Sequence, residues 1–185
     1  MAFETTVPAF LTKSTLINAS TRADPFAVVL AGLGAVSGPL HGRASLFVQR
    51  LLADAEQTSA EAACARVLSA GECLAGFGHL VYPDSDPRAS CLLSRLCAYL
   101  PARRWVRIER LIALGREATG RKETVDFALG VLSQELKMIP GGSEAVFAFA
   151  RIAGWIAHAL EEYQEKPLRF RAHSVYLGPV LGPNA

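Results

Sequence analysis

The sequence predicts an all-α fold, and three observations favour it. Apolar residues recur at helical spacing through nearly every segment, and no convincing pair of strands can be found. The pairs Asp24-Pro25 and Asp86-Pro87 are typical helix starts, because the carboxylate caps free N–H groups and proline fits the first turn. With 51% hydrophobic and 19% charged residues among 185, the chain can form a sizeable core.

The first three expected helices are bounded by caps and glycines. The first begins at Asp24-Pro25 and stops at Gly38-Pro39, and the second carries apolar residues at helical spacing between Leu46 and Leu52. The third runs from about Ser59 to Gly71. Residues 73–84 contain two glycines, a proline and no helical period, so we expect a long loop there. Loops of that length in helical proteins are often functional.

Four further helices are expected after this loop. Asp86-Pro87 starts the next one, and an amphipathic pattern places another at 105–119. Thr124 is expected to cap a helix that Gly141-Gly142 breaks. Residues 143–163 form a long helix that is apolar on most faces, so we expect it to be buried.

Charge and apolar patterning argue against several function classes. A net charge of +2 is too near neutral to favour binding to nucleic acid or to an acidic membrane. The longest apolar run, residues 25–36, is too short to cross a bilayer. No basic residue precedes Lys13, so no signal peptide is predicted and a cytoplasmic protein is expected. Arginines cluster within residues 103–110, either as the solvated face of a helix or as an anion site for a phosphate-bearing cofactor.

Four side chains are candidates for chemistry. His41 and His79 lie in the segments Gly-Pro-Leu-His-Gly and Gly-Phe-Gly-His, where glycine lets backbone approach a ligand. Arg88 and Asp126 fall in the first turns of two helices, and a cation there suggests a nearby anion. Each residue alone also has a structural explanation as a cap, a core group or half of an ion pair. Together they suit a reaction that moves protons on a carbonyl compound and holds an acid substrate.

The same segments, in the same order, resemble the citrate synthase family. Residues 38–42 match the family's Gly-Pro-Leu-His-Gly, and residues 76–88 are similar to its Gly-Phe-Gly-His-x-x-Tyr loop ending in Asp-Pro-Arg. Residues 125–127 match its Val-Asp-Phe segment. Residues 151–158 resemble its late helix and residues 176–179 its closing tail, so the resemblance covers most of the chain.

The resemblance implies a role for each candidate. Asp126 would remove a methyl proton from acetyl-CoA, and His41 would hydrogen-bond the resulting enol oxygen. His79 would bind and protonate the carbonyl oxygen of oxaloacetate, and Arg88 would clamp one of its carboxylates. The loop residues lying against the adenine of CoA would be Gly76, Phe77 and Gly78. The implied acyltransferase reaction condenses acetyl-CoA, or another short acyl-CoA, with oxaloacetate to give citrate and free CoA, as in the tricarboxylic acid cycle. It needs no metal and no permanently bound cofactor.

The chain also departs from the family pattern. It has about half the usual length, and residues 7–20 contain no counterpart of a family histidine that binds oxaloacetate. Thr124 stands where the family has asparagine. A second carboxylate clamp falls on Arg169 or Arg171, and the spacing to Tyr176 favours Arg171.

The resemblance also implies an architecture, a citrate synthase-like helical fold truncated at the N-terminus. Residues 1–42 would be partial large-domain helices, residues 43–141 the small closing domain on the CoA side, and residues 142–185 the returning large-domain helix and tail. Expected partners are oxaloacetate and acyl-CoA, with a second copy in a homodimer or a full-length paralogue. The alternative function is a truncated, non-catalytic relative that acts as a binding or regulatory partner.

Overall fold

The computed structural model describes residues 10–38 and 44–170, and within these ranges the chain is helical. An isolated β-bridge between Phe77 and Glu123 is the one strand-like pairing in this part of the chain. The all-α prediction is therefore confirmed. In chain order the helices are α1 (Phe10–Ser20), α2 (Pro25–Val36), α3 (Ala44–Gln57), α4 (Ala60–Ser69), α5 (Pro87–Tyr99), α6 (Ala102–Thr119), α7 (Val125–Glu135) and α8 (Gly142–Glu162).

Three predicted helix starts are confirmed by their caps. The Asp24 carboxylate accepts hydrogen bonds from two backbone N–H groups of α2, and the Ser59 hydroxyl accepts one from α4. The Asp86 carboxylate accepts one from the first turn of α5. Such caps satisfy N–H groups that have no partner inside the helix, and each stabilises the fold by about 1 kcal/mol.

Other boundaries differ from the prediction. Helix α1 is not among the expected helices, because its sequence is rich in hydroxyl groups and lacks an amphipathic period. Helix α6 begins at Ala102 instead of Trp105. Helix α7 ends at Glu135 and does not continue to Gly141, since Lys137 adopts a left-handed φ of 50° that a regular helix cannot contain.

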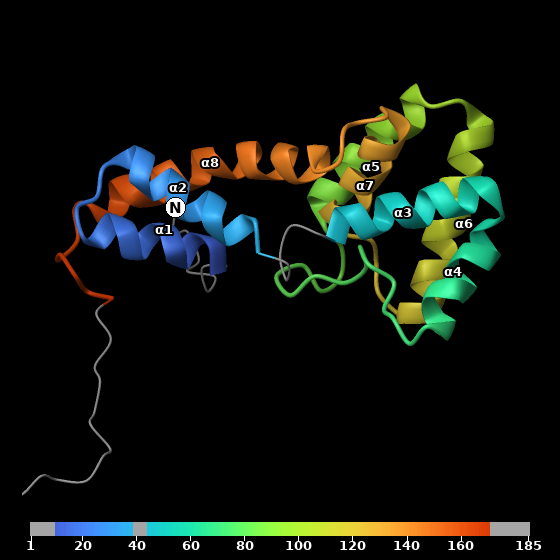
Figure 1. Ribbon diagram of the computed structural model, residues 1–185, viewed down its shortest axis with the longest axis horizontal. Helices are drawn as coiled ribbons and strands as arrows, with labels where there is room; N and C mark the ends of the chain where they lie inside the picture. Colours follow the sequence, from blue (N-terminus) through green and yellow to red (C-terminus); the bar gives the residue numbers. More distant parts are fainter. Residues whose placement is uncertain (1–9, 39–43, 171–185) are drawn as a thin grey trace, which may run out of the picture.

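The helices form two lobes (Figure 1). Helices α1 and α2 pack against α8 in the first lobe, and α3 to α7 form the second. The beginning of α8 also contacts α7 and α3, where Ser45 Oγ donates to Ser143 Oγ at 2.9 Å. Helix α8 therefore links the two lobes. The division into large-domain segments (residues 1–42 and 142–185) and a small closing domain (residues 43–141) stays a prediction.

The core of the second lobe forms around α7. Phe127 and Val131 of α7 are fully buried and share one cluster with Val48 of α3. Phe77 reaches this cluster from the loop between α4 and α5, and Gly115 of α6 makes the room for it. A Cβ atom at Gly115 would lie 2.0 Å from the Phe77 ring, so only glycine permits this contact. The loop is thereby anchored to the core.

Each lobe contains one of the two tryptophans of the chain. Trp155 of α8 is fully buried in the first lobe against Gly32 of α2, where a Cβ atom would lie 2.7 Å from the indole ring. Trp105 of α6 is half-buried in the second lobe, and its Nε1–H donates to the Glu109 carboxylate at 2.7 Å. The indoles therefore occupy different environments.

Helix α8 is apolar on most faces, as expected, but within the chain it is buried on one face only. Its opposite face exposes a row of apolar residues at alternating spacings of three and four, the pattern by which two helices pack. We call this row the α8 seam: Val146, Phe149, Ala153, Ile156 and Leu160. Within the described ranges, no helix is both long and apolar enough to span a bilayer.

Candidate active site

The loop between α4 and α5 is fixed to the segment before α7 by backbone hydrogen bonds. The Gly78 N–H donates to the Lys122 carbonyl at 2.8 Å, and the Thr124 N–H donates to the Gly76 carbonyl at 2.8 Å. The Thr124 hydroxyl also donates to that carbonyl at 3.2 Å, so it does not cap α7 as predicted. Gly76 and Gly78 have φ values of 86° and 80°, which glycine adopts without strain.

The Phe77 side chain points into the core of the second lobe. Its ring centroid lies 5.2 Å from that of Phe127, and its tip fills the space over Gly115. The aromatic ring of Phe77 therefore holds the loop in place. The contact of Gly76, Phe77 and Gly78 with the adenine of CoA stays a prediction.

His79, Tyr82 and Arg88 form a cluster around the Tyr82 ring. The rings of His79 and Tyr82 have centroids 5.1 Å apart, and the Arg88 guanidinium carbon lies 5.0 Å from the Tyr82 centroid. Arg88 Nη2 lies 3.3 Å from His79 Nε2. A ring face attracts a guanidinium through its quadrupole, so Tyr82 orients both neighbours. Tyr82 is not among the predicted site residues, although it belongs to the motif that predicted His79.

The contact with the Val81 backbone assigns the tautomer of His79. The Val81 N–H donates to His79 Nδ1 at 3.1 Å, so the proton of the neutral imidazole is on Nε2. Arg88 has donors and no acceptor. His79 Nε2–H and Arg88 Nη2–H are therefore two donors facing each other at 3.3 Å. An oxygen atom of a ligand, especially an anionic one, would accept from both.

The Asp86 carboxylate holds the guanidinium group of Arg88 along one edge. Its Oδ1 accepts from Arg88 Nε at 2.9 Å and its Oδ2 accepts from Arg88 Nη2 at 2.8 Å. Burial alone would raise the pKa of Asp86, but the hydrogen bonds from Arg88 and from the Val125 N–H outweigh it and lower that pKa. Asp86 is therefore a buried carboxylate that stays charged.

Asp126 lies in the first turn of α7, near Arg88. Burial alone would lower the pKa of Arg88, but its pairing with Asp86 opposes this effect. With smaller contributions from Tyr82 and Asp126, the pKa of Arg88 is raised. The Asp126 side chain is half-buried. The structure thus brings three predicted site residues, His79, Arg88 and Asp126, to one region.

Arg151 of α8 reaches the same region from the first lobe. It is half-buried, and its Nη2 donates to the buried Thr12 hydroxyl of α1 at 2.6 Å. Burial and the positive charge of Arg88 both lower the pKa of Arg151, while Tyr82 raises it slightly. Sequence reasoning did not assign Arg151 to the site. The signal was a single arginine within the otherwise apolar segment 145–157.

Arg169 does not join this cluster. Its Nε donates to both carboxylate oxygens of Glu162 at 2.9 and 3.0 Å, and this pairing raises the pKa of Arg169. Glu162 follows Arg151 by eleven residues, roughly 16 Å along α8 at 1.5 Å per residue. His41 and Arg171 lie outside the described residues, so their predicted roles stay predictions.

Three of the four clustered arginines of α6 are paired with glutamates, which favours the solvated-face interpretation over an anion site. The pairs are Arg104 with Glu135 at 2.8 Å, Arg107 with Glu56 at 3.6 Å and Arg110 with Glu61 at 2.6 Å. In the part of the chain that the structure describes, no group of three His, Cys, Asp or Glu side chains is arranged to hold a metal ion.

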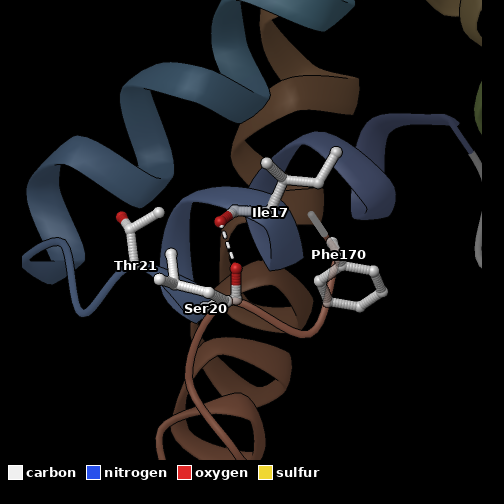
Figure 2. A pocket seen from close by; sticks show the side chains of 5 residues that line it. Ile17, Ser20, Thr21 and Phe170 are labelled. Carbon is white, nitrogen blue, oxygen red and sulfur yellow. Dashed lines mark hydrogen bonds between the residues drawn. The ribbon is translucent and has the colours of Figure 1, made fainter. Parts of the chain in front are cut away.

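A hollow of about 210 Å³ lies in the first lobe, at the end of α1 that is opposite Thr12 (Figure 2). Ile17, Ser20 and Thr21 line it together with Leu168 and Phe170. The Ser20 hydroxyl donates to the Ile17 carbonyl at 2.7 Å, so its one proton already has a hydrogen-bond acceptor. None of these side chains titrates near neutral pH, so the hollow offers no acid–base chemistry.

Comparison with known proteins identifies one family over most of the chain. The family of the citrate synthase C-terminal domain matches residues 10–171. The citrate synthase of Haloferax volcanii is 34% identical over 176 residues, which cover 90% of this chain and 45% of that protein. The 2-methylcitrate synthase 1 of Corynebacterium glutamicum is 31% identical over 172 residues, with the same coverage. The chain spans about half the length of the curated relatives it matches.

Solved structures show the same relationship. The citrate synthase from Thermotoga maritima MSB8 has a TM-score of 0.76 and 32% identity, covering 95% of this chain and 50% of that one. The citrate synthase from Thermoplasma acidophilum, solved with carboxymethyl coenzyme A and oxaloacetate, has a TM-score of 0.76 and 28% identity, covering 95% and 49%. The citryl-CoA lyase from Hydrogenobacter thermophilus, at 24% identity and a TM-score of 0.78, shares the fold.

We expect His79 and His158 to be opposite tautomers. His79 accepts at Nδ1, whereas His158 Nδ1 faces the Glu161 carboxylate at 3.3 Å and must carry a proton to donate to it. Proton–nitrogen correlation NMR of the neutral imidazoles should show an unprotonated Nδ1 in His79 and a protonated one in His158. A protonated Nδ1 in His79 would contradict the donor pair with Arg88.

Proposed function

Because this chain belongs to the citrate synthase family, we propose that the cluster around His79 and Arg88 binds oxaloacetate for condensation with an acyl-CoA. The observation that carries the proposal is the 3.3 Å approach of Arg88 Nη2 to His79 Nε2, with the Val81 N–H donating to His79 Nδ1 so that Nε2 carries the proton. A keto acid supplies carbonyl and carboxylate oxygens that such donors would bind. Donors fixed before the reaction also stabilise negative charge as it develops.

A dicarboxylate matches the charges of the cluster. Asp86 pairs with Arg88, but no carboxylate in the described ranges forms an ion pair with Arg151. Burial and the positive charge of Arg88 lower the pKa of Arg151, so an anion placed between the two guanidinium groups would stabilise both. Oxaloacetate has two carboxylates, which allows one for each guanidinium.

The proposed reaction forms a carbon–carbon bond and needs a base at the acetyl-CoA carbon and an acid at the oxaloacetate carbonyl. Asp126 would take a proton from the carbon next to the thioester of acetyl-CoA, leaving an enolate, and the predicted role of His41 is to hydrogen-bond its oxygen. The enolate carbon would attack the carbonyl carbon of oxaloacetate while the carbonyl oxygen takes the Nε2 proton of His79. Water would then cleave the citryl thioester to citrate and free CoA.

The exposed seam of α8 suggests that the chain works in an assembly. The α8 seam exposes 75% of Phe149 and 56% of Leu160. We propose that a second copy covers this seam, because alternating spacings of three and four allow two α8 helices to pack against each other. A full-length paralogue in place of the second copy is an outcome that the mass of the complex distinguishes.

Replacing Arg88 tests the anion clamp. We expect Arg88→Leu to weaken oxaloacetate binding by about 2–4 kcal/mol, the scale for removing one partner of a buried charge pair. Isothermal titration calorimetry measures this, with Arg95→Leu as the control because Arg95 is an exposed arginine on the same helix. Equal affinity of wild type and Arg88→Leu would rule out the clamp.

Replacing Asp126 distinguishes an enzyme from the second candidate, a non-catalytic relative that only binds. If the chain is catalytic, Asp126→Asn should lower the release of free CoA thiol from acetyl-CoA and oxaloacetate by about 100-fold or more. Its oxaloacetate affinity should stay near that of the wild type. Binding of oxaloacetate without thiol release by the wild type would favour the binding relative.

Substitutions at two equally exposed positions test the proposed dimer. Phe149 of the seam and Tyr99 of α5 are both 75% exposed, so lysine at either position disturbs a similar amount of surface. Phe149→Lys should give a monomer in sedimentation velocity, because a charge at the centre of a helix pair is costly to bury. Tyr99→Lys should leave the dimer intact. A monomeric wild type at micromolar concentration would contradict the proposal.

A further inference from the structure

We propose that Asp86 is a positioning residue that sets the candidate site by holding Arg88 and the start of α7 on one buried carboxylate. The inference rests on the proposed function and extends it to a residue whose burial keeps it away from the ligand. The Asp86 side chain is only 1% exposed. It caps the helix that carries Arg88 and contacts the first residue of the helix that carries Asp126.

Four hydrogen bonds converge on the two oxygens of this carboxylate. Oδ1 accepts the backbone N–H and the Nε–H of Arg88 at 3.0 and 2.9 Å. Oδ2 accepts the Arg88 Nη2–H at 2.8 Å and the Val125 N–H at 2.9 Å. An amide cannot replace the carboxylate here, because its NH₂ group would face at least one of these donors.

The contact determines which edge of the Arg88 guanidinium meets a ligand. Asp86 occupies the Nε–Nη2 edge, so the Nη1–Nη2 edge is left, and Nη2 is also the atom nearest His79. A guanidinium that is fixed before the ligand arrives loses less side-chain freedom on binding. Asp86 thereby strengthens ligand binding through Arg88 without touching the ligand.

The bond to Val125 extends this control to the residue proposed as the base. Val125 is the first residue of α7 and Asp126 is the second, so a displaced Val125 N–H would displace Asp126 as well. A misplacement of about 1 Å in a reacting group costs on the order of 100-fold in rate. One carboxylate thus sets the distance between the anion-binding group and the proton-abstracting group.

The substitution Asp86→Ser separates positioning from helix capping. Serine remains a good cap for α5, but it has no charge and cannot hold both Arg88 and Val125. In calorimetry with the full chain, we expect it to weaken oxaloacetate binding on the order of 10-fold or more. In an Arg88→Leu background the same change should alter affinity by less than about twofold, because residues acting through one contact are not additive. No loss in the wild-type background, or equal losses in both, would overturn the proposal.

A measurement without ligand separates this proposal from the proposed function. The Val125 amide and the Arg88 Nε–H should exchange slowly with solvent in wild-type NMR spectra, and Asp86→Ser should accelerate both. The Phe26 amide, which Asp24 caps, serves as the unaffected control. Slow exchange in a wild type that fails to bind oxaloacetate would refute the function and support the positioning role. Fast exchange of the Val125 amide in the wild type would overturn the positioning role. If the Asp86→Ser variant does not fold, Asp86→Asn is the second variant to be measured.

Discussion

The second lobe depends on the burial of one negative charge, the Asp86 carboxylate. A carboxylate removed from water is costly unless its hydrogen bonds are all made and a cation lies beside it. Here the donors come from the starts of two helices and from one guanidinium, so α5 and α7 must begin next to each other. The loop with His79 leads into α5, and Asp126 follows the first residue of α7. Both sides of the proposed chemistry are therefore placed by a single electrostatic requirement.

The first lobe contributes a second positive charge to this arrangement. Arg151 is held by the Thr12 hydroxyl, which does not neutralise it, and its pKa falls because it is buried near Arg88. Two like charges in a partly buried region repel each other unless an anion separates them. The energetic cost of keeping Arg151 there without a ligand is consistent with a site formed by both lobes, of which neither is complete alone.

Local signals in the sequence were sufficient for features that form over a few residues. The caps at Asp24, Ser59 and Asp86 act within three residues of themselves, so their helix starts could be predicted directly. Features that sequence reasoning missed include contacts between residues far apart in the chain. The Thr124 hydroxyl binds Gly76 and leaves α7 uncapped, and the ring of Phe77 fills the space over Gly115.

The same distinction explains what could be predicted of the candidate site. The motif around His79 and Arg88 is continuous in sequence, and its members lie together as expected. Arg151 joins them only because α8 spans both lobes, which no local pattern indicates.

The placement of one indole in each lobe has a consequence for spectroscopy. Trp155 is shielded from water and Trp105 is partly exposed, so their fluorescence should peak at different wavelengths. Without any added label, the protein carries a separate optical reporter for each half of its fold.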